Sequence, residues 1–133
     1  MIGLDTKILV RLLVNDDLVQ AQIARDLIKH PGGIFIGKTV LLELEWVLRQ
    51  VYQVDKKTLM AGLTKLLGLP NVTIESVAQV AQAMKDFSKG MDFADALHLA
   101  STHGSILMYT FDKKFAKLAT PERVILATRK ATL

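Results

Sequence analysis

The sequence predicts an α/β protein with a central parallel five-stranded sheet and helices on both faces. Five short apolar segments rich in β-branched residues alternate with longer segments whose apolar residues recur at helical spacing. Parallel strands need a crossover between them, usually a helix, and are buried on both faces, so short continuous apolar runs are typical of them. The chain has 133 residues, half of them hydrophobic, which is enough for one domain with one core. We expect a single domain over residues 1–127 and a short C-terminal tail over residues 128–133.

In the first half of the chain, the pattern predicts a strand, two helices, a second strand and two more helices. Polar residues mark the helix starts: Asn15-Asp16-Asp17 breaks the first helix and caps the second, and Asp55 caps the fourth. The buried face of the second helix is expected to include Ile23. The third helix has the clearest amphipathic pattern in the sequence. The expected strands are 2–4 and 34–36, and the expected helices are 7–14, 18–29, 39–51 and 56–67.

The second half continues the alternation of strands and helices. A third strand over 72–74 leads into a helix over 77–87, and a break at 88–90 separates it from a helix over 92–103. Asp92 is expected to cap that helix at its start, and Gly104 to follow its end in the C′ position. A strand over 106–109, a short helix over 113–118 and a fifth strand over 124–126 complete the predicted fold.

Composition excludes several classes of function. The chain has no cysteine, which rules out disulfides, thiolate metal sites and cysteine nucleophiles. No apolar run approaches the ~20 residues of a membrane span, and the first residues lack the features of a secretory leader. We therefore expect a cytoplasmic protein with no membrane association. The net charge of +4 permits a nucleic-acid partner but does not require one.

Acidic residues occur in unusual places in this sequence. Asp92 and Asp95 lie three residues apart among small and apolar neighbours, so they share one helical face. Helix capping alone explains both of them. However, Asp5, Glu43 and Asp112 also lie within or directly after hydrophobic runs that are far apart in the sequence. Charged residues in such positions are uncommon unless they have a role.

The predicted fold offers a way to bring acids together. In a parallel sheet, ligands bind outside the carboxyl ends of the strands, where Asp5 and Asp112 lie. Glu43 and Asp95 lie one turn inside neighbouring helices. Converging carboxylates repel each other unless they bind a cation, and oxygen ligands favour Mg²⁺, or Mn²⁺ in its place. The chemistry suited to such a site is phosphoryl transfer or phosphodiester hydrolysis with a metal-activated water.

The acids lie in motifs that resemble those of a known family. These are Leu4-Asp5-Thr6, Leu42-Glu43-Leu44, Asp92-Phe-Ala-Asp95-Ala-Leu and Thr110-Phe-Asp112-Lys-Lys-Phe115. In order and spacing they resemble the acidic motifs of the PIN-domain ribonucleases, and most of all the VapC-type toxins of toxin–antitoxin pairs. The resemblance implies a PIN-like three-layer sandwich and a Mg²⁺-dependent endoribonuclease. It also implies a homodimer that a cognate antitoxin inhibits.

The resemblance also assigns roles to residues. Asp5, Glu43, Asp95 and Asp112 are implied to be the metal-binding and catalytic acids. Supporting roles fall to Thr6 and Thr110, whose hydroxyls are implied to position the acids, and to Asp92, for which we favour a helix cap with a possible role behind the metal ligands. The sequence departs from the family pattern at Lys7, where asparagine is usual. Candidate RNA contacts are Lys7, Lys38, Lys113 and Lys114.

Three other residues receive structural interpretations. Glu45 points away from Glu43 by helical geometry and is expected to be a solvated or interface charge rather than a ligand. His98 is expected to be a packed, hydrogen-bonded histidine. Trp46 lies off the main apolar face, so it either completes the core or marks a dimer or antitoxin surface, and we favour the surface.

Two other functions are alternatives to the nuclease hypothesis. A phospho-aspartyl protein is disfavoured, because a phosphatase of that class needs an aspartate where Lys7 stands, and a receiver domain needs one where Glu75 stands. The other alternative is a catalytically idle PIN-like module that binds RNA or a protein partner. The intact set of acids weakens it, and metal binding distinguishes the two.

Overall fold

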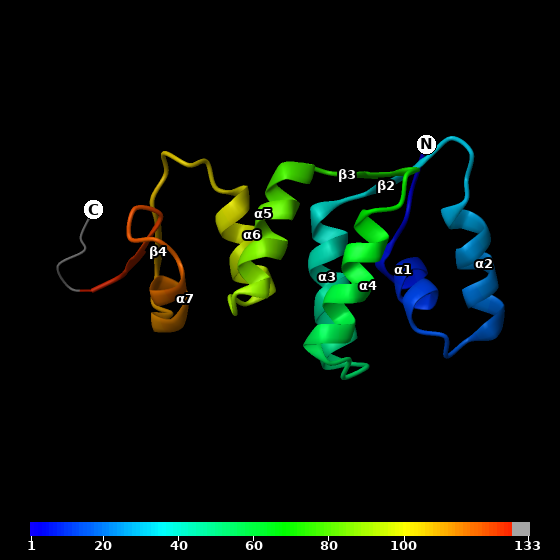
Figure 1. Ribbon diagram of the computed structural model, residues 1–133, viewed down its shortest axis with the longest axis horizontal. Helices are drawn as coiled ribbons and strands as arrows, with labels where there is room; N and C mark the ends of the chain where they lie inside the picture. Colours follow the sequence, from blue (N-terminus) through cyan, green and yellow to red (C-terminus); the bar gives the residue numbers. More distant parts are fainter. Residues whose placement is uncertain (129–133) are drawn as a thin grey trace. The chain divides into compact units, whose positions relative to one another are not determined.

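The computed structural model describes residues 1–128 and divides the chain into two compact units, residues 1–77 and the residues from 78 onward. The predicted tail lies outside the described residues, except for Thr128. Figure 1 traces the order of the elements along the chain. None of the helices between residues 1 and 128 has the length and apolar character needed to span a lipid bilayer.

The first unit is built on three parallel strands in the order β1-β2-β3. These strands are β1 (Ile2–Gly3), β2 (Ile34–Ile36) and β3 (Val72–Ile74). Ile34 pairs with both Ile2 and Val72, so β2 is the central strand, and its two isoleucines are fully buried. The helices between these strands are α1 (Thr6–Leu13), α2 (Leu18–Ile28), α3 (Lys38–Gln50) and α4 (Lys56–Leu67).

Helix packing in the first unit joins α1 to both α2 and α3, and α3 to α4. Buried leucines at helical spacing on α3, Leu41, Leu44 and Leu48, form the apolar face that this packing covers. Asp17, the last residue of the predicted break, caps α2, and Asp55 caps α4 as predicted; each accepts a hydrogen bond from a backbone N–H in the first turn. Ile23 on α2 is 51% exposed, so its predicted burial is wrong: α1 covers the side of α2 that carries the small Ala21 and Ala24.

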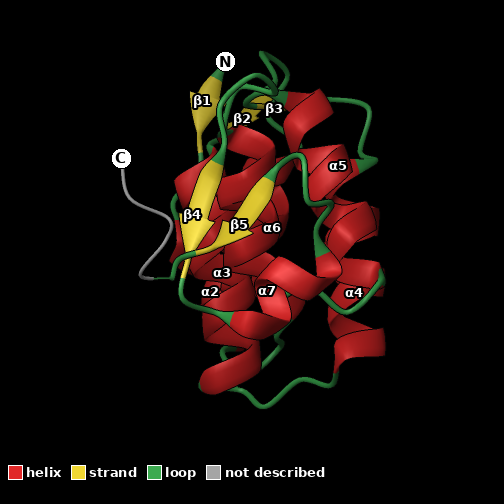
Figure 2. Cartoon of the chain, turned by 90° about the vertical axis from the view of Figure 1, so that its left-hand side faces the viewer, coloured by secondary structure: helices red, strands yellow, loops and turns green. Residues whose placement is uncertain are grey.

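The second unit contains the remaining helices and a pair of parallel strands. Its elements are α5 (Val77–Ser88), α6 (Phe93–Ser101), β4 (Met108–Thr110), α7 (Lys113–Leu118) and β5 (Val124–Leu126), with Val77 on the boundary. Figure 2 shows β4 and β5 side by side, with α7, which connects them, in contact with both. The rings of Phe87 and Phe93 meet edge to face at 5.4 Å. Gly90, between α5 and α6, has a φ of +107°, which explains a glycine at the predicted break.

Comparison with the predicted elements confirms the α/β class and the parallel strand pairing. Hydrogen bonds join the described strands in two small sheets, so a single five-stranded sheet within a three-layer sandwich stays a prediction. Two predicted boundaries were wrong by two residues, and the others agree within one residue. Helix α6 ends at Ser101 with Thr102 as its C-cap in an extended conformation, so Gly104 is not at C′. Strand β4 begins at Met108, because Ile106 precedes the pairing with β5 and is 54% exposed.

Candidate functional site

Asp5 lies between β1 and α1, where it caps the helix. Its side-chain Oδ1 accepts a hydrogen bond of 2.7 Å from the backbone N–H of Thr6. Thr6 is only 4% exposed, and its Oγ1 is buried without a hydrogen-bond partner among residues 1–128. The positioning of Asp5 therefore comes from the backbone of Thr6, and the side-chain hydroxyl proposed for that role is left unpaired.

Glu43 lies on the exposed border of α3, and this helix packs against α1. As a result, Asp5 and Glu43 line the same pocket, which has a volume of about 460 Å³. Lys7 lines it too, so one of the candidate RNA contacts lies beside two of the predicted acids. The structure thus brings together two carboxylates that are far apart in the sequence, a lysine and an unpaired buried hydroxyl. The complete lining is Asp5, Thr6, Lys7, Val10, Arg11, Glu43, Val47, Val51 and Tyr52.

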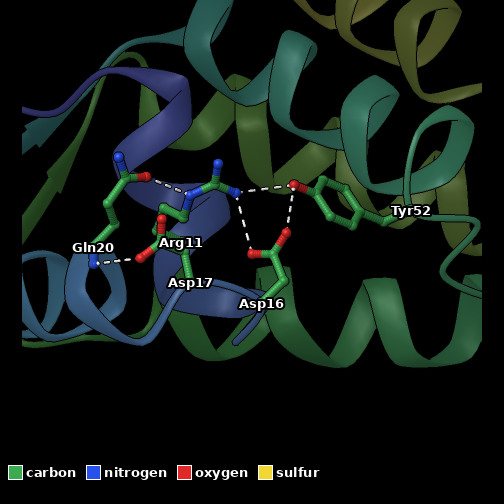
Figure 3. A network of polar contacts seen from close by, with 5 residues as sticks. All are labelled: Arg11, Asp16, Asp17, Gln20 and Tyr52. Atoms are coloured by element: carbon green, nitrogen blue, oxygen red, sulfur yellow. Dashed lines mark hydrogen bonds and ion pairs between the residues drawn. The ribbon is translucent and has the colours of Figure 1, made fainter.

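A polar network at this pocket was not predicted from the sequence. Figure 3 shows Arg11 of α1 held between Gln20, Asp16 and Tyr52. The Tyr52 hydroxyl accepts from Arg11 and donates to Asp16, which closes a ring of three hydrogen-bonded groups. The hydrogen bond to Tyr52, and then the charge of Asp16, raise the pKa of Arg11. The sequence held one signal for Arg11, which lies four residues after Lys7 on the same face of α1.

The second unit holds the other predicted acids. Asp92 caps α6 as predicted, accepting the backbone N–H of Asp95 at 3.4 Å. Asp112 caps α7 by accepting the backbone N–H of Phe115 at 3.0 Å. The hydroxyl oxygen of Thr110 in turn accepts the backbone N–H of Asp112, also at 3.0 Å. The first turn of α7 then carries two exposed candidate RNA contacts, Lys113 and Lys114.

The surroundings of Asp95 shift its pKa. Partial burial, together with the negative charges of Asp92 and Asp112, raises its pKa, and His98 opposes the shift. The carboxylates of Asp92 and Asp112 therefore lie close enough to Asp95 for the three charges to interact.

The possible metal ligands are divided between the two units. Asp5 and Glu43 belong to the first unit, and Asp92, Asp95 and Asp112 to the second. Within residues 1–128, no group of three or more acidic, histidine or cysteine side chains is close enough to enclose a metal ion. The donors themselves fit a hard cation, because carboxylates and the unpaired hydroxyl of Thr6 are oxygen ligands.

The predictions for Glu45 and His98 are corrected, and the structure also places Trp46 and Lys38. Glu45 is buried at 2% exposure and forms an ion pair with Arg49, with Nε to Oε2 at 2.8 Å, so it is not a solvated charge. His98 is exposed on α6 and is not packed. Trp46 is 53% exposed, which excludes a place in the core of the first unit. Lys38 is half-buried at the start of α3, where its backbone N–H donates to Glu75 Oε1 at 2.8 Å.

The chain is similar to a known protein family and to a solved structure. A family model described as "PIN domain" matches residues 2–121. A crystal structure of the toxin VapC20 of Mycobacterium tuberculosis, described as a sarcin-ricin loop cleaving toxin, matches with 19% identity and a TM-score of 0.45. The match covers 88% of this chain and 94% of that one. No curated protein matches the sequence.

Proposed function

The chain belongs to the PIN domain family, and from this premise we propose that it is a metal-dependent endoribonuclease of the VapC type, the toxin of a toxin–antitoxin pair. The observation that carries the proposal is the pocket shared by Asp5 and Glu43, two acids from separate motifs. The raised pKa of Asp95 beside Asp92 and Asp112 supports the same chemistry in the second unit. The toxin assignment rests on the order and spacing of the acidic motifs along the sequence.

In the proposed site, Asp5, Glu43, Asp95 and Asp112 hold Mg²⁺, or Mn²⁺ in its place. When bound, the ion lowers the pKa of a water molecule and stabilises the charge on the leaving oxygen of the RNA phosphodiester.

The residues of the chain prepare this site through their own contacts. The backbone N–H groups at the starts of α1 and α7 fix one oxygen of Asp5 and of Asp112. The Thr110 hydroxyl oxygen holds the backbone of Asp112. Lys7, at the pocket wall, contributes a positive charge that attracts the RNA backbone, and Lys38, Lys113 and Lys114 are proposed to add to it.

The first experiment incubates the purified full chain, free of other proteins, with end-labelled tRNA and rRNA fragments in Mg²⁺ or Mn²⁺. We expect discrete cleavage that EDTA abolishes and that Asp5→Asn removes. Asp26→Asn is the matched control, because Asp26 lies on α2, accepts a hydrogen bond from Gln22 and does not line the pocket. Cleavage that persists in Asp5→Asn refutes the proposed site.

A second measurement separates the enzyme from an idle binding module. Isothermal titration with Mn²⁺ should show binding to the wild type and much weaker binding to Asp5→Asn. Absence of Mn²⁺ binding to the wild type contradicts the metal-dependent mechanism and favours the idle module.

The proposal also includes an antitoxin, a homodimer and a cytoplasmic location, where the RNA substrate lies. Trp46, 53% exposed on α3, is the side chain that we propose for one of these protein interfaces. Light scattering of the wild type and of Trp46→Ser tests the homodimer. A monomeric wild type at micromolar concentration refutes it, and an unchanged dimer in the variant removes Trp46 from that interface.

A further inference from the structure

The pocket of Asp5 and Glu43 has lining residues that the proposed cleavage reaction does not use. Arg11 and Tyr52 contribute a cation and an aromatic ring, and three valines contribute apolar surface. The volume of about 460 Å³ falls within the range of about 300–1,000 Å³ that is typical of sites for small molecules. The pocket therefore has room for more than a metal ion and its water molecules.

Arg11 is held in place before any ligand arrives. Its Nε donates to Gln20 Oε1 at 2.6 Å. One terminal nitrogen of its guanidinium group, Nη1, donates to both Tyr52 Oη at 3.0 Å and Asp16 Oδ1 at 3.2 Å. Gln20 is itself fixed at the start of α2, where its backbone N–H donates to Asp17 (Figure 3). The other terminal nitrogen of the guanidinium group, Nη2, makes no hydrogen bond with residues 1–128 and remains able to donate to a ligand.

A second cation lies close to Arg11. Lys7 and Arg11 are four residues apart on α1 and therefore occupy the same face of this helix, and both line the pocket. Two cations thus lie beside two carboxylates. When the reacting phosphate of an RNA chain is held at the acids, a neighbouring phosphate of the same chain can meet these cations. This charge pattern suits the phosphodiester backbone of RNA.

Tyr52 provides an aromatic ring on which a nucleic-acid base can stack. Its hydroxyl is bound to Arg11 and Asp16, so the orientation of its ring is fixed. Bases of any kind stack on aromatic rings, and apolar side chains make van der Waals contacts with the base and the sugar. Val10, Val47 and Val51 provide such apolar surface in the same pocket.

We propose that this pocket is a subsite for one nucleotide of a single-stranded RNA next to the cleavage point. Arg11, with Lys7, binds a backbone phosphate, and the base stacks on Tyr52 among the three valines. The inference rests on the proposed function, because the acids in the same pocket are what make this nucleotide a neighbour of the scissile bond. It adds a preference for unpaired RNA, since a base within a duplex is not free to stack on a side chain.

The test measures binding rather than cleavage. A labelled single-stranded oligoribonucleotide is titrated with the full chain in EDTA, and the affinity is followed by fluorescence anisotropy at several salt concentrations. Arg11→Gln should bind about tenfold more weakly and reduce the slope of log K against log salt by about 0.7, the value for one phosphate contact on a single strand. Arg11→Lys should restore the slope, because it restores the charge.

Tyr52 is tested by a pair of variants. Tyr52→Leu should weaken binding about tenfold with an unchanged salt slope, because it removes stacking and no charge. Tyr52→Phe keeps the ring and should retain most of the affinity. Arg25→Gln is the matched control for Arg11→Gln, since Arg25 lies on α2, bonds to Gln22 and does not line the pocket.

The outcomes separate this inference from the proposed function. Wild-type affinity in both Arg11→Gln and Tyr52→Leu refutes the subsite, even if the protein cleaves RNA. Equal losses in Arg25→Gln and Arg11→Gln also refute it, because the effect is then one of general charge. If the predicted pattern of binding is found but the wild type cleaves no RNA in Mg²⁺ or Mn²⁺, the subsite stands and the proposed nuclease fails.

Discussion

Glu43 and Glu45, two residues apart on α3, are expected to respond in opposite ways to the same substitution. Glu43 is exposed and lines the pocket with Asp5, whereas Glu45 is 2% exposed and paired with Arg49. Replacing either glutamate by glutamine removes one negative charge and preserves the shape of the side chain. We expect Glu43→Gln to lose Mn²⁺ binding and RNA cleavage without a loss of stability. Glu45→Gln should lose stability and keep metal binding.

The magnitude follows from the environment of each side chain. The carboxylate of Glu45 receives two hydrogen bonds from Arg49, at 2.8 and 3.4 Å. Breaking a fully buried ion pair by removing one partner costs about 3–5 kcal/mol. Because the Arg49 side chain is 40% exposed, water screens its charge, and we expect a loss of about 1–3 kcal/mol for Glu45→Gln. For Glu43→Gln the change should stay within about 0.5 kcal/mol.

The assay is urea unfolding of both variants and the wild type, followed by circular dichroism, with Mn²⁺ titration on the same samples. The unfolding midpoint should fall for Glu45→Gln and stay close to that of the wild type for Glu43→Gln. The reasoning is refuted if Glu45→Gln loses Mn²⁺ binding while remaining folded, or if Glu43→Gln is the less stable of the two.

Four further predictions concern the other acids and Thr6. Asp92→Asn keeps the helix cap but removes a neighbouring negative charge, so the pKa of Asp95 should fall toward its ordinary value in a carboxyl NMR titration; an unchanged value contradicts the assigned cause. Because folding raises the pKa of Asp95, its contribution to stability should be lost as the pH rises from the ordinary aspartate range through the raised value. Urea unfolding across that pH range should show this loss for the wild type and a smaller loss for Asp92→Asn. Asp112→Asn and Asp112→Ala should both abolish cleavage, but only the alanine variant should also lose about 1 kcal/mol in urea unfolding, because it removes the cap on Phe115; equal stability of the two refutes a capping role. Thr6→Val removes a buried hydroxyl without a partner in residues 1–128, so it should raise the stability of the metal-free protein by about 1 kcal/mol in thermal unfolding, and a lower stability indicates a partner for that hydroxyl.

The parts of the fold that the sequence predicted best are those with local signals. The bounds of α4 and α7 match the prediction, because a capping aspartate starts each helix and the apolar spacing continues to its end. The start of α6 was predicted on the same grounds. Its end was not, because a glycine near a helix terminus is a permissive signal, and here Thr102 ends the helix with a hydrogen bond from its hydroxyl to the His98 carbonyl.

The parts that were missed depend on contacts between distant residues. Glu45 lies at the border of an amphipathic face, and whether such a border is buried depends on the helices packed beside it. The hydrogen bond between Arg11 and Tyr52 joins α1 to the segment after α3, and neither residue carries a local motif. The shared pocket of Asp5 and Glu43 was predictable because a parallel sheet dictates which strand ends meet.

In the proposed site, the aspartates at the starts of α1, α6 and α7 link helix formation to cation affinity. Asp5, Asp92 and Asp112 each use one carboxylate oxygen to accept a backbone N–H, which leaves the second oxygen outside the cap. Their side chains lose rotational freedom when the helix forms, so a bound cation has little left to immobilise. The same side chains also cap the helix starts, so a substitution that cannot cap weakens the fold and the proposed site together. Asparagine still caps a helix but carries no charge, so it separates the two effects.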